Sequence, residues 1–346
     1  MTRPKRVLVT GGSGYFGCTV VAELRRRGHE VTVFDLVDVE DRAPDVRFVQ
    51  GDIRDEAAIR RACEGIDVVH HDVAQVPLAK DAALFQSVNV DGAANLLEGA
   101  RRERVAKVVL VSSSAVFGVP SKNPVDESVS PAPREAYGRA KLDAERIARR
   151  YVDTGLDVTI VRPRTILGHG RLGIFQILFE WVRTGKPVWV LGGGHNRYQF
   201  VHADDLADAC IRAGDLPGPA TFNIGAERFG TMRQALEALV AHAGTHSRVR
   251  SLPMGLTVRA MELTSRLGLS PLGAYHSLMY GREMFFDLEP AKRALGWQPR
   301  FSNDEMLCES YDDYVAHRGE ILARTNASHH RSAVKQGILR ALELLP

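Results

Sequence analysis

The fold is decided close to the N-terminus, by the stretch RVLVTGGSGYFG that runs from Arg6 to Gly17. Its first part, Arg6 to Thr10, is a short β-branched run of the kind that forms a buried strand. Closely spaced glycines follow at once, and then a helical pattern from Phe16 to Arg27. Glycines at such a turn allow backbone N–H groups to approach a phosphate at the positive end of a helix. The stretch therefore predicts a phosphate-binding turn, with a purely structural turn as the alternative.

The same rhythm of short apolar runs and longer helical patterns continues through the first half of the chain. We expect strands over Arg6–Thr10, Val31–Phe34, Val46–Val49, Val68–His71, Lys107–Val111 and Val158–Val161. We expect helices over Phe16–Arg27, Glu56–Glu64, Leu84–Arg102 and Ala136–Tyr151. Several of these strands are apolar on consecutive positions, which is typical of strands covered by helices on both faces. The pattern predicts a doubly wound, Rossmann-type α/β fold with a mainly parallel sheet.

The sequence pattern changes after about residue 165, where glycine clusters at 168–173 and 192–194 alternate with helical patterns. No long polar linker separates the halves. We therefore expect a dinucleotide-binding domain over 1–165, with 198–225 threaded back onto it. A smaller α/β substrate lobe then takes up 166–197 and 226–328, and a basic amphipathic helix takes up 329–346.

Composition and charge exclude several classes of protein. The 346 residues are 45% hydrophobic, 25% charged and 7% aromatic, as in ordinary globular proteins. The net charge of +3 gives no electrostatic footprint for nucleic acid. The four cysteines are scattered, and the two pairs of adjacent histidines, at 70–71 and 329–330, lack the spacing of metal ligands. We therefore expect no metal. With neither a signal peptide nor a long apolar run, we expect a cytoplasmic protein.

The acidic residue Asp35 stands at the end of the second predicted strand. A carboxylate at this place is expected to hydrogen-bond an adenosine ribose and to repel the additional phosphate of NADP. The nearest arginine that follows, Arg42, is too far along the chain to accept that phosphate. These features predict NAD as the cofactor.

The Gly-x-x-Gly-x-x-Gly spacing resembles the extended branch of the short-chain dehydrogenase/reductase superfamily, the NAD-dependent epimerase/dehydratase family. Further segments carry the resemblance: GDIRD at 51–55, VVHHDVA at 68–74, which is one residue longer than usual, and NVDG at 89–92. The resemblance implies these cofactor-binding residues: Gly11, Gly14, Tyr15, Phe16, Gly17, Asp35, Asp52, Ile53, Ala74, Asn89, Tyr137 and Lys141.

A phenol and an ammonium group stand four residues apart in the segment YGRAK at 137–141. In a helix this spacing puts Tyr137 and Lys141 on one face, and the pair resembles the catalytic pair of the superfamily. A nearby ammonium and the positive nicotinamide ring would lower the pKa of the phenol, so Tyr137 becomes the expected general base. Lys141 is also expected to hold the nicotinamide ribose. The alternative is an amphipathic helix with an exposed Tyr and Lys.

The expected third catalytic residue follows the fifth strand, in the segment SSSAVFG at 112–118. Counting back from Gly118, as the family motif requires, selects Ser113 as the hydroxyl that binds the reacting oxygen, with Ser114 as its near competitor. Dehydratase relatives carry an Asp-Glu pair after this hydroxyl, but here Ser114 and Ala115 follow. Without those proton carriers, hydride chemistry remains: dehydrogenation, reduction or epimerisation.

The segment RYQFVHADD at 197–205 resembles a motif whose arginine contacts the diphosphate of nucleotide sugars. We therefore assign Arg197 to the substrate, although it could instead pair with Asp204 or Asp205. Thr165 stands where such enzymes usually have asparagine, and Arg282 is the basic residue nearest to a ribose clamp that is not in register. The predicted substrate contacts are Ser113, Ser114, Thr165, Arg197 and Arg282.

Three functional hypotheses follow. The first is an NAD-dependent sugar epimerase of the 4-epimerase type, with a sugar nucleotide as the expected substrate. The alternative is a net dehydrogenase or reductase of a lipid-linked, sterol-like or alicyclic secondary alcohol, and the third is a non-catalytic NAD-binding scaffold. We expect a homodimer that binds no nucleic acid. The helix over 329–346 is expected to pack on its own lobe or on a partner subunit, with contact to a membrane surface as the other reading.

Overall fold

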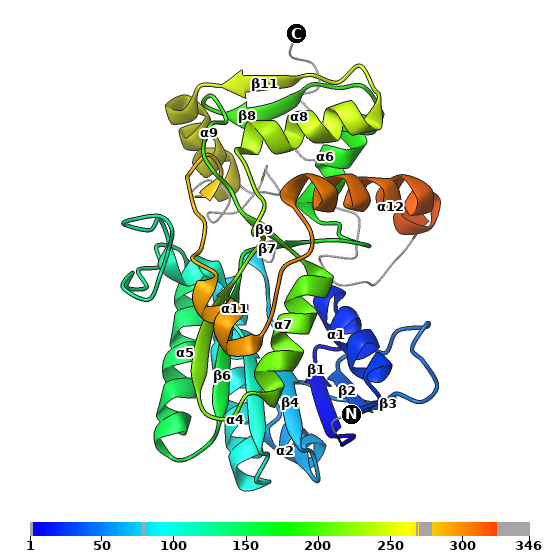
Figure 1. The fold of residues 1–346 in the computed structure, drawn as a ribbon, viewed down its shortest axis with the longest axis vertical. Coiled ribbons are helices and arrows are strands. Elements are labelled where there is room, and N and C mark those ends of the chain that lie inside the picture. The colour runs from blue at the N-terminus through cyan, green and yellow to red at the C-terminus, as the bar shows by residue number, and fades with distance from the viewer. Residues whose placement is uncertain (1–2, 78–80, 268, 270–278, 324–346) are drawn as a thin grey trace.

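The structure is a computed structural model, and it describes residues 3–77, 81–267, 269 and 279–323 (Figure 1). Its strands are β1 (Arg6–Thr10), β2 (Glu30–Asp35), β3 (Arg47–Gln50), β4 (Val68–His71), β5 (Lys107–Val111), β6 (Val158–Pro163), β7 (Thr165–Leu167), β8 (Val188–Leu191), β9 (Phe200–His202), β10 (Ala220–Ile224) and β11 (Val249–Leu252). Its α-helices are α1 (Tyr15–Arg26), α2 (Glu56–Cys63), α3 (Ala82–Leu84), α4 (Gly92–Arg102), α5 (Ala136–Asp153), α6 (Ile174–Arg183), α7 (Ala203–Asp215), α8 (Met232–Ala243), α9 (Met254–Arg266), α11 (Glu289–Leu295) and α12 (Asn303–Ala323). The expected helix over 329–346 lies outside the described residues.

Seven strands form one parallel sheet in the order β10-β6-β5-β4-β1-β2-β3. The six strands expected from the sequence are all present in it, with small shifts at their ends. The chain winds outward from β1 in one direction through β2 and β3, and in the other through β4, β5 and β6. This confirms the doubly wound α/β fold. In such sheets the crevice for a ligand lies at the carboxyl ends of the strands, where the winding reverses.

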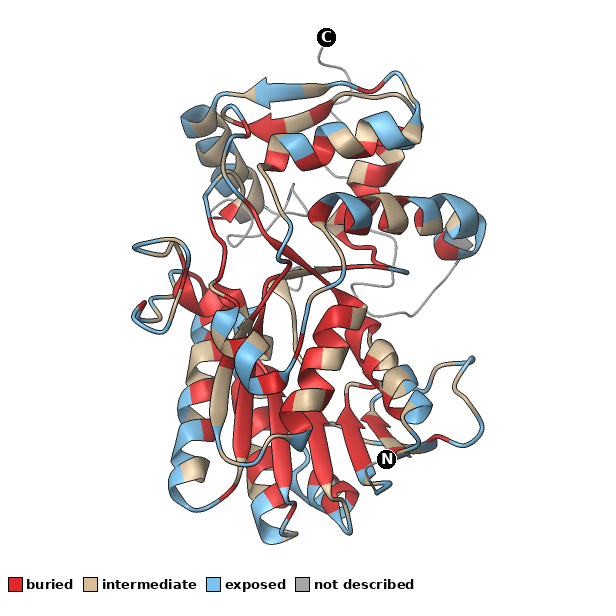
Figure 2. Cartoon of the chain, viewed as in Figure 1, coloured by how far each residue is buried: buried red, intermediate tan, exposed pale blue. Residues whose placement is uncertain are grey.

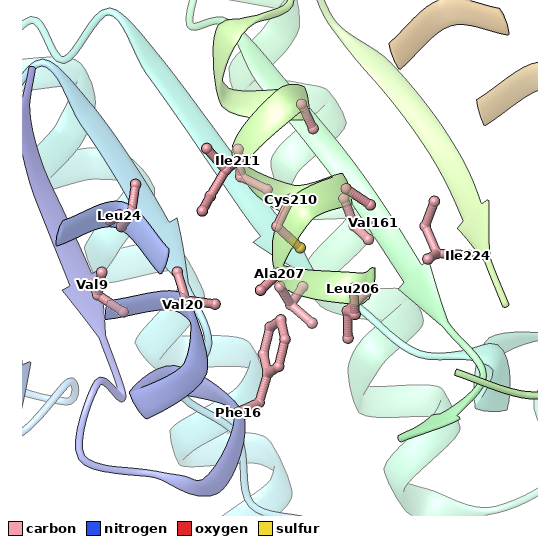
Figure 3. Packing of buried hydrophobic residues seen from close by; sticks show 14 of the residues in the cluster. Val9, Phe16, Val20, Leu24, Val161, Leu206, Ala207, Cys210, Ile211 and Ile224 are labelled. Carbon is pink, nitrogen blue, oxygen red and sulfur yellow. The ribbon is translucent and has the colours of Figure 1, made fainter. Parts of the chain in front are cut away.

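Helices cover both faces of the sheet, so successive strand residues are buried in different layers. Val7 and Val9 of β1 pack in the cluster that includes α1 and α7, whereas Leu8 packs in the cluster that includes α2, α4 and α5. Figure 2 shows the central strands of the large sheet as mostly buried, and Figure 3 shows Phe16 of α1 and Leu206 and Ala207 of α7 in one hydrophobic cluster. This two-sided burial explains why the strands are apolar at consecutive positions.

The segment expected as one helix over 84–102 is interrupted by a different helical form. After α3, residues Phe85–Asp91 form a π-helix, η2, and only then does α4 begin. Within η2, the Asn89 side chain accepts a hydrogen bond from the Gln75 backbone N–H at 2.7 Å and donates one to the Gln75 carbonyl at 2.9 Å. Short π-helical turns frequently occur at functional sites, and this one ties the helix to the loop that follows β4.

A second group of elements lies at the end of the molecule away from the large sheet (Figure 1). There β8 pairs with β11, while β7 pairs with β9 nearer the sheet. Residues of α6, α8 and α12 share one hydrophobic cluster. The chain returns through α7 to β10, which pairs with β6. The exact domain boundaries remain a prediction. Within the described part of the chain, no helix combines the length and the apolar character needed to cross a membrane.

Candidate active site

A large cavity opens at the carboxyl ends of the central strands and extends into the second group of elements. Its volume is about 1440 Å³. Among the predicted site residues, those lining it are Gly11, Gly14, Tyr15, Phe16, Gly17, Asp35, Asp52, Ile53, Ala74, Ser113, Ser114, Tyr137, Lys141 and Thr165. The fold thus brings to one place residues that are distant in the sequence.

The glycine turn is packed too closely for side chains at some of its positions. Gly11 has a φ of +78°, in the region that favours glycine, and its N–H donates to the Phe34 carbonyl at 2.9 Å. A Cβ atom built on Gly17 would lie 2.1 Å from the Gly11 carbonyl oxygen. The turn therefore sits directly against the start of α1. This leaves a side-chain-free cradle at the helix N-terminus that fits the pyrophosphate of a dinucleotide.

Gly17→Ala is expected to weaken NAD binding by about tenfold or more, because the new methyl group would force the turn and the helix apart. Gly319→Ala is the matched control, because Gly319 lies in α12 away from the turn and no heavy atom lies within 4 Å of a Cβ atom built on it. Titration with NAD and thermal unfolding of both variants measure the difference. Equal losses in the two variants would show that close approach at Gly17 does not shape the turn.

The end of the cavity beside the glycine turn carries the predicted acidic residue. The Asp35 carboxylate accepts hydrogen bonds from the Ser13 N–H at 3.0 Å and the Leu36 N–H at 2.7 Å, so it is held beside the glycine turn. Burial raises the pKa of Asp35, and the backbone hydrogen bonds act in the opposite direction. Asp52, which pairs with Arg54, lines the same end together with the buried Ile53.

Asn89, one of the predicted cofactor contacts, lies behind the loop that follows β4. Although Asn89 is among the described residues, it does not line the cavity, and its amide is used by both backbone groups of Gln75. Gln75 itself lines the cavity directly after Ala74. Asn89 therefore positions the loop that bears Ala74 and Gln75, because its side chain is already paired with the backbone of that loop.

A helix cap and a close glycine contact position Tyr137 at the start of α5. The Glu135 carboxylate caps the helix, accepting from the Tyr137 N–H at 2.7 Å and the Gly138 N–H at 2.6 Å. A Cβ atom on Gly138 would lie 2.5 Å from the Ala115 carbonyl oxygen, so glycine allows α5 to approach the segment after β5. That approach brings the Tyr137 phenol within hydrogen-bonding reach of the Ser113 hydroxyl.

Lys141 lies one helical turn further on and points to the end of β5. Its ammonium group donates to the Val111 carbonyl at 2.9 Å. Burial lowers the pKa of Lys141 to about 8, while the neighbouring carboxylates of Asp72 and Glu145 act to raise it. Burial raises the pKa of Tyr137 to about 12, although the hydrogen bond with Ser113 acts to lower it. The phenol is therefore protonated in the ligand-free protein, and it needs further positive charge nearby to act as a base.

The two candidate serines have different partners. The Ser113 hydroxyl faces Tyr137 and accepts from the Ala115 N–H at 3.1 Å. The Ser114 hydroxyl accepts a hydrogen bond from Arg164 at 3.0 Å. The geometry therefore favours Ser113 over Ser114 as the hydroxyl next to the reacting oxygen. Thr165 also lines the cavity, with its hydroxyl 3.0 Å from that of Tyr198.

The structure does not bring Arg197 or Arg282 to the cavity, although both are described residues. Both side chains are exposed. The Arg197 guanidinium lies over the Phe285 ring, 4.2 Å from its centre, and 5.0 Å from the centre of the Phe229 ring. The predicted diphosphate contact of Arg197 is therefore not supported, because its cation already rests on these aromatic side chains. Asp205, one of the alternative partners of Arg197, pairs with Arg300 at 2.8 Å.

Asp72 and Arg171 are among the charged cavity residues that the sequence did not single out. The carboxylate oxygens of Asp72 are buried and neither has a hydrogen-bond partner; burial raises the pKa of Asp72 to about 7, and Lys141 acts to lower it. Asp72 lies in the segment VVHHDVA at 68–74, but the neighbouring residues give no sign that its carboxylate is buried at the cavity. Arg171 lies between β7 and α6 and is buried at the cavity wall. Its glycine-rich surroundings have no periodic pattern from which its burial could be predicted.

His169, His202 and Glu309 place three potential metal-ligand atoms within 4.8 Å of one another. His202 Nδ1, however, accepts the backbone N–H of Asp204 at 3.1 Å, and Nε2 is 3.0 Å from a Glu309 oxygen. A neutral ring with that Nδ1 contact carries its proton on Nε2 and donates it to Glu309. A metal at Nε2 would leave the ring with no proton on either nitrogen, so the geometry favours a hydrogen-bonded pair.

Residues 7–225 match the model of the NAD dependent epimerase/dehydratase family. The chain is 52% identical to uncharacterized protein y4nG of Sinorhizobium fredii, over 99% of this chain and 87% of that protein. It is 31% identical, over 90% of each chain, to the 3 beta-hydroxysteroid dehydrogenase/Delta 5-->4-isomerase of Mycobacterium tuberculosis. Among solved structures it resembles the UDP-glucose 4-epimerase of Thermus thermophilus in complex with NAD, with 26% identity, a TM-score of 0.74, and coverage of 90% of this chain and 99% of that one.

Proposed function

Because the chain belongs to the NAD-dependent epimerase/dehydratase family, we propose that this NAD-dependent enzyme oxidises an apolar, alicyclic secondary alcohol. The observation that carries this choice is the character of the cavity wall beyond Ser113 and Tyr137. That wall includes the apolar and aromatic side chains Phe175, Leu178, Trp181, Trp189, Met232, Leu236, Leu252 and Met261. Burying such a surface favours a hydrocarbon ring system over a sugar.

The roles of the cavity residues follow from their positions. When bound, NAD supplies the acceptor for the hydride that leaves the carbinol carbon. Ser113 would hold the substrate oxygen, and Tyr137 would take the hydroxyl proton from it. Lys141, on the same face of α5, would stabilise the phenolate that accepts this proton. The segment after Ser113 continues with Ser114 and Ala115, which carry no carboxylate for a dehydration step.

Three further points support an apolar substrate over a nucleotide sugar. Arg197, the arginine assigned to a diphosphate, lies outside the cavity on an aromatic surface. Leu256 and Leu263 of α9 are exposed, whereas Thr257 and Met261 of the same helix line the cavity. The helix at this wall therefore has apolar residues on two sides, as suits an entrance for a lipid-like molecule. The 31% identical relative is named for activity on steroids.

A second candidate is the sugar epimerase, which is favoured by the similarity to UDP-glucose 4-epimerase. In that reaction the hydride would return to the opposite face of the same carbon. No reduced cofactor would then accumulate, because the net redox change is zero. The same Ser113, Tyr137 and Lys141 would serve both reactions, so the catalytic groups do not discriminate between the two candidates.

The test is to incubate the protein and NAD with two panels, one of hydroxysteroids and simple alicyclic alcohols, the other of UDP-sugars. We expect reduced nicotinamide to accumulate in proportion to ketone with a member of the first panel. We expect no change in the stereochemistry of any UDP-sugar. Inversion of a UDP-sugar carbon without release of reduced cofactor would overturn the dehydrogenase in favour of the epimerase. The Tyr137→Phe variant serves as the control for contaminating activity.

A further inference from the structure

Arg171 is a buried cation in the wall of the cavity, next to the reacting groups. The residue is 9% exposed and lies in the loop between β7 and α6. Its guanidinium lies 5.3 Å from the ring centre of Tyr15 and 5.6 Å from that of Phe175. Tyr15 opens α1 directly after the glycine turn, whereas Tyr137 is the other phenol close enough to influence the charge of Arg171. Arg171 therefore stands where the cofactor region meets the catalytic phenol.

No carboxylate among the described residues compensates this charge. The Arg171 Nε has no hydrogen-bond partner, and the ionisable neighbours that favour its charge are the phenols of Tyr15 and Tyr137. Burial lowers the pKa of Arg171 to about 10, so the group still carries its charge at neutral pH. A buried charge without a counter-ion is unfavourable, and an approaching anion removes that disadvantage.

Two other buried arginines of the same region donate hydrogen bonds to described residues, although Nη2 of Arg164 has no partner. Arg162 donates to the Glu145 carboxylate at 2.8 and 2.5 Å. Arg164 donates to the Gln199 carbonyl at 3.1 Å and to the Ser114 hydroxyl at 3.0 Å, and it stacks over the Tyr198 ring at 4.6 Å. Arg171 differs from both because its described surroundings offer it mainly aromatic faces. Its planar donor group remains available to a ligand.

We propose that Arg171 binds an anionic group, a phosphate or a carboxylate, that enters the cavity beside Tyr15 and Tyr137. The anion has two possible sources, a phosphate of the cofactor and an acidic group on the substrate close to the reacting carbon. The proposal rests on the proposed function only in taking this cavity as the place where cofactor and substrate bind. Binding measurements need no turnover, so its failure is distinguishable from the failure of the proposed reaction.

The experiment compares Arg171→Gln and Arg171→Met with Arg183→Gln. Arg183 lies on the next helix, α6, and does not line the cavity; it forms an ion pair of 2.8 Å with Glu180. Its variant therefore controls for the loss of one positive charge. Trp181 and Trp189 line the cavity, and quenching of their fluorescence reports binding. In the first arm each protein is titrated with NAD. In the second arm the NAD-saturated proteins are titrated with a steroid carboxylic acid and with its uncharged methyl ester.

If the anion belongs to the cofactor, the dissociation constant for NAD rises by about 10- to 100-fold in both Arg171 variants. If it belongs to the substrate, NAD binding is unchanged, and the wild-type preference for the acid over its ester is lost by a similar factor. Either result supports the proposal. Affinities in both arms that stay within about twofold of the Arg183→Gln control would overturn it.

Stability provides an independent readout. Because Arg171→Met removes a buried charge that lacks a counter-ion, the ligand-free variant is expected to unfold at the same temperature as the wild type or higher. A clear fall in the unfolding temperature of the ligand-free Arg171→Met variant would mark Arg171 as a structural residue and contradict the proposal. Failure of both Arg171 variants to fold would have the same meaning.

Discussion

Tyr137→Phe is expected to lower kcat by a factor of about 100 to 10,000 while NAD binds with unchanged affinity. The substitution removes only the phenolic oxygen, which would take the substrate proton. The ring remains, so its edge-to-face packing on Phe85, with ring centres 5.9 Å apart, is preserved. Steady-state turnover with an alcohol that proves active in the panel above and NAD titration measure the two quantities separately.

Tyr151→Phe is the matched control for this prediction. Tyr151 lies on the same helix, and its hydroxyl donates to Glu98 at 3.2 Å, far from the cavity. Its variant should retain wild-type turnover. Undiminished kcat in Tyr137→Phe would show that another group takes the proton, and Asp72, the buried carboxyl group beside Lys141, would then be the first to examine.

Glu145→Gln is expected to lower the free energy of unfolding by about 3 kcal/mol, since it leaves the buried Arg162 guanidinium without a compensating charge. The Glu145 side chain is fully buried and accepts from two nitrogens of Arg162, at 2.8 and 2.5 Å, and from the Ser112 hydroxyl at 2.6 Å. These bonds join α5, which carries Tyr137, to β6 and to the end of β5. Denaturant unfolding measures the loss.

Asp143→Asn provides the comparison on the same helix. Asp143 pairs with Arg146 at 2.8 Å on the solvent side, and loss of such an exposed pair should change the free energy of unfolding by less than about 0.5 kcal/mol. The double variant Glu145→Gln with Arg162→Met should be more stable than Glu145→Gln alone, because the uncompensated charge is gone. Similar small losses for Glu145→Gln and Asp143→Asn would refute the importance of the buried pair.

Most of the large sheet could be predicted because its signals are local. A few consecutive apolar residues indicate each strand, and helical periodicity indicates each of the long helices. The π-helix around Asn89 could not be predicted in this way. Its hydrogen-bond pattern accompanies the contact of Asn89 with Gln75, which belongs to a loop 14 residues earlier in the chain.

The candidate site likewise contains residues that the local sequence predicts and residues whose position depends on distant segments. The glycine turn and Asp35 follow from short local patterns, and the pair of Tyr137 and Lys141 follows from a short motif that resembles the catalytic pair of the superfamily. The family motif already favoured Ser113 over Ser114, and the structure adds a partner for Ser114, whose hydroxyl accepts a hydrogen bond from Arg164. The position of Arg197 could not be predicted from the sequence, because its guanidinium lies over Phe229 and Phe285, which belong to later segments of the chain.

The sequence by itself determined the doubly wound fold, the NAD cofactor and the phenol and ammonium groups expected to perform the chemistry, because these depend on backbone geometry and helical spacing over a few residues. The proposed substrate side of the cavity depends on the tertiary structure, and no short stretch of sequence predicts it. Its apolar wall combines α6, β8, α8 and α9, and the uncompensated charge of Arg171 exists only because the fold buries that side chain among aromatic rings. Burial and pairing are properties of the three-dimensional surroundings, and no short stretch of sequence contains them.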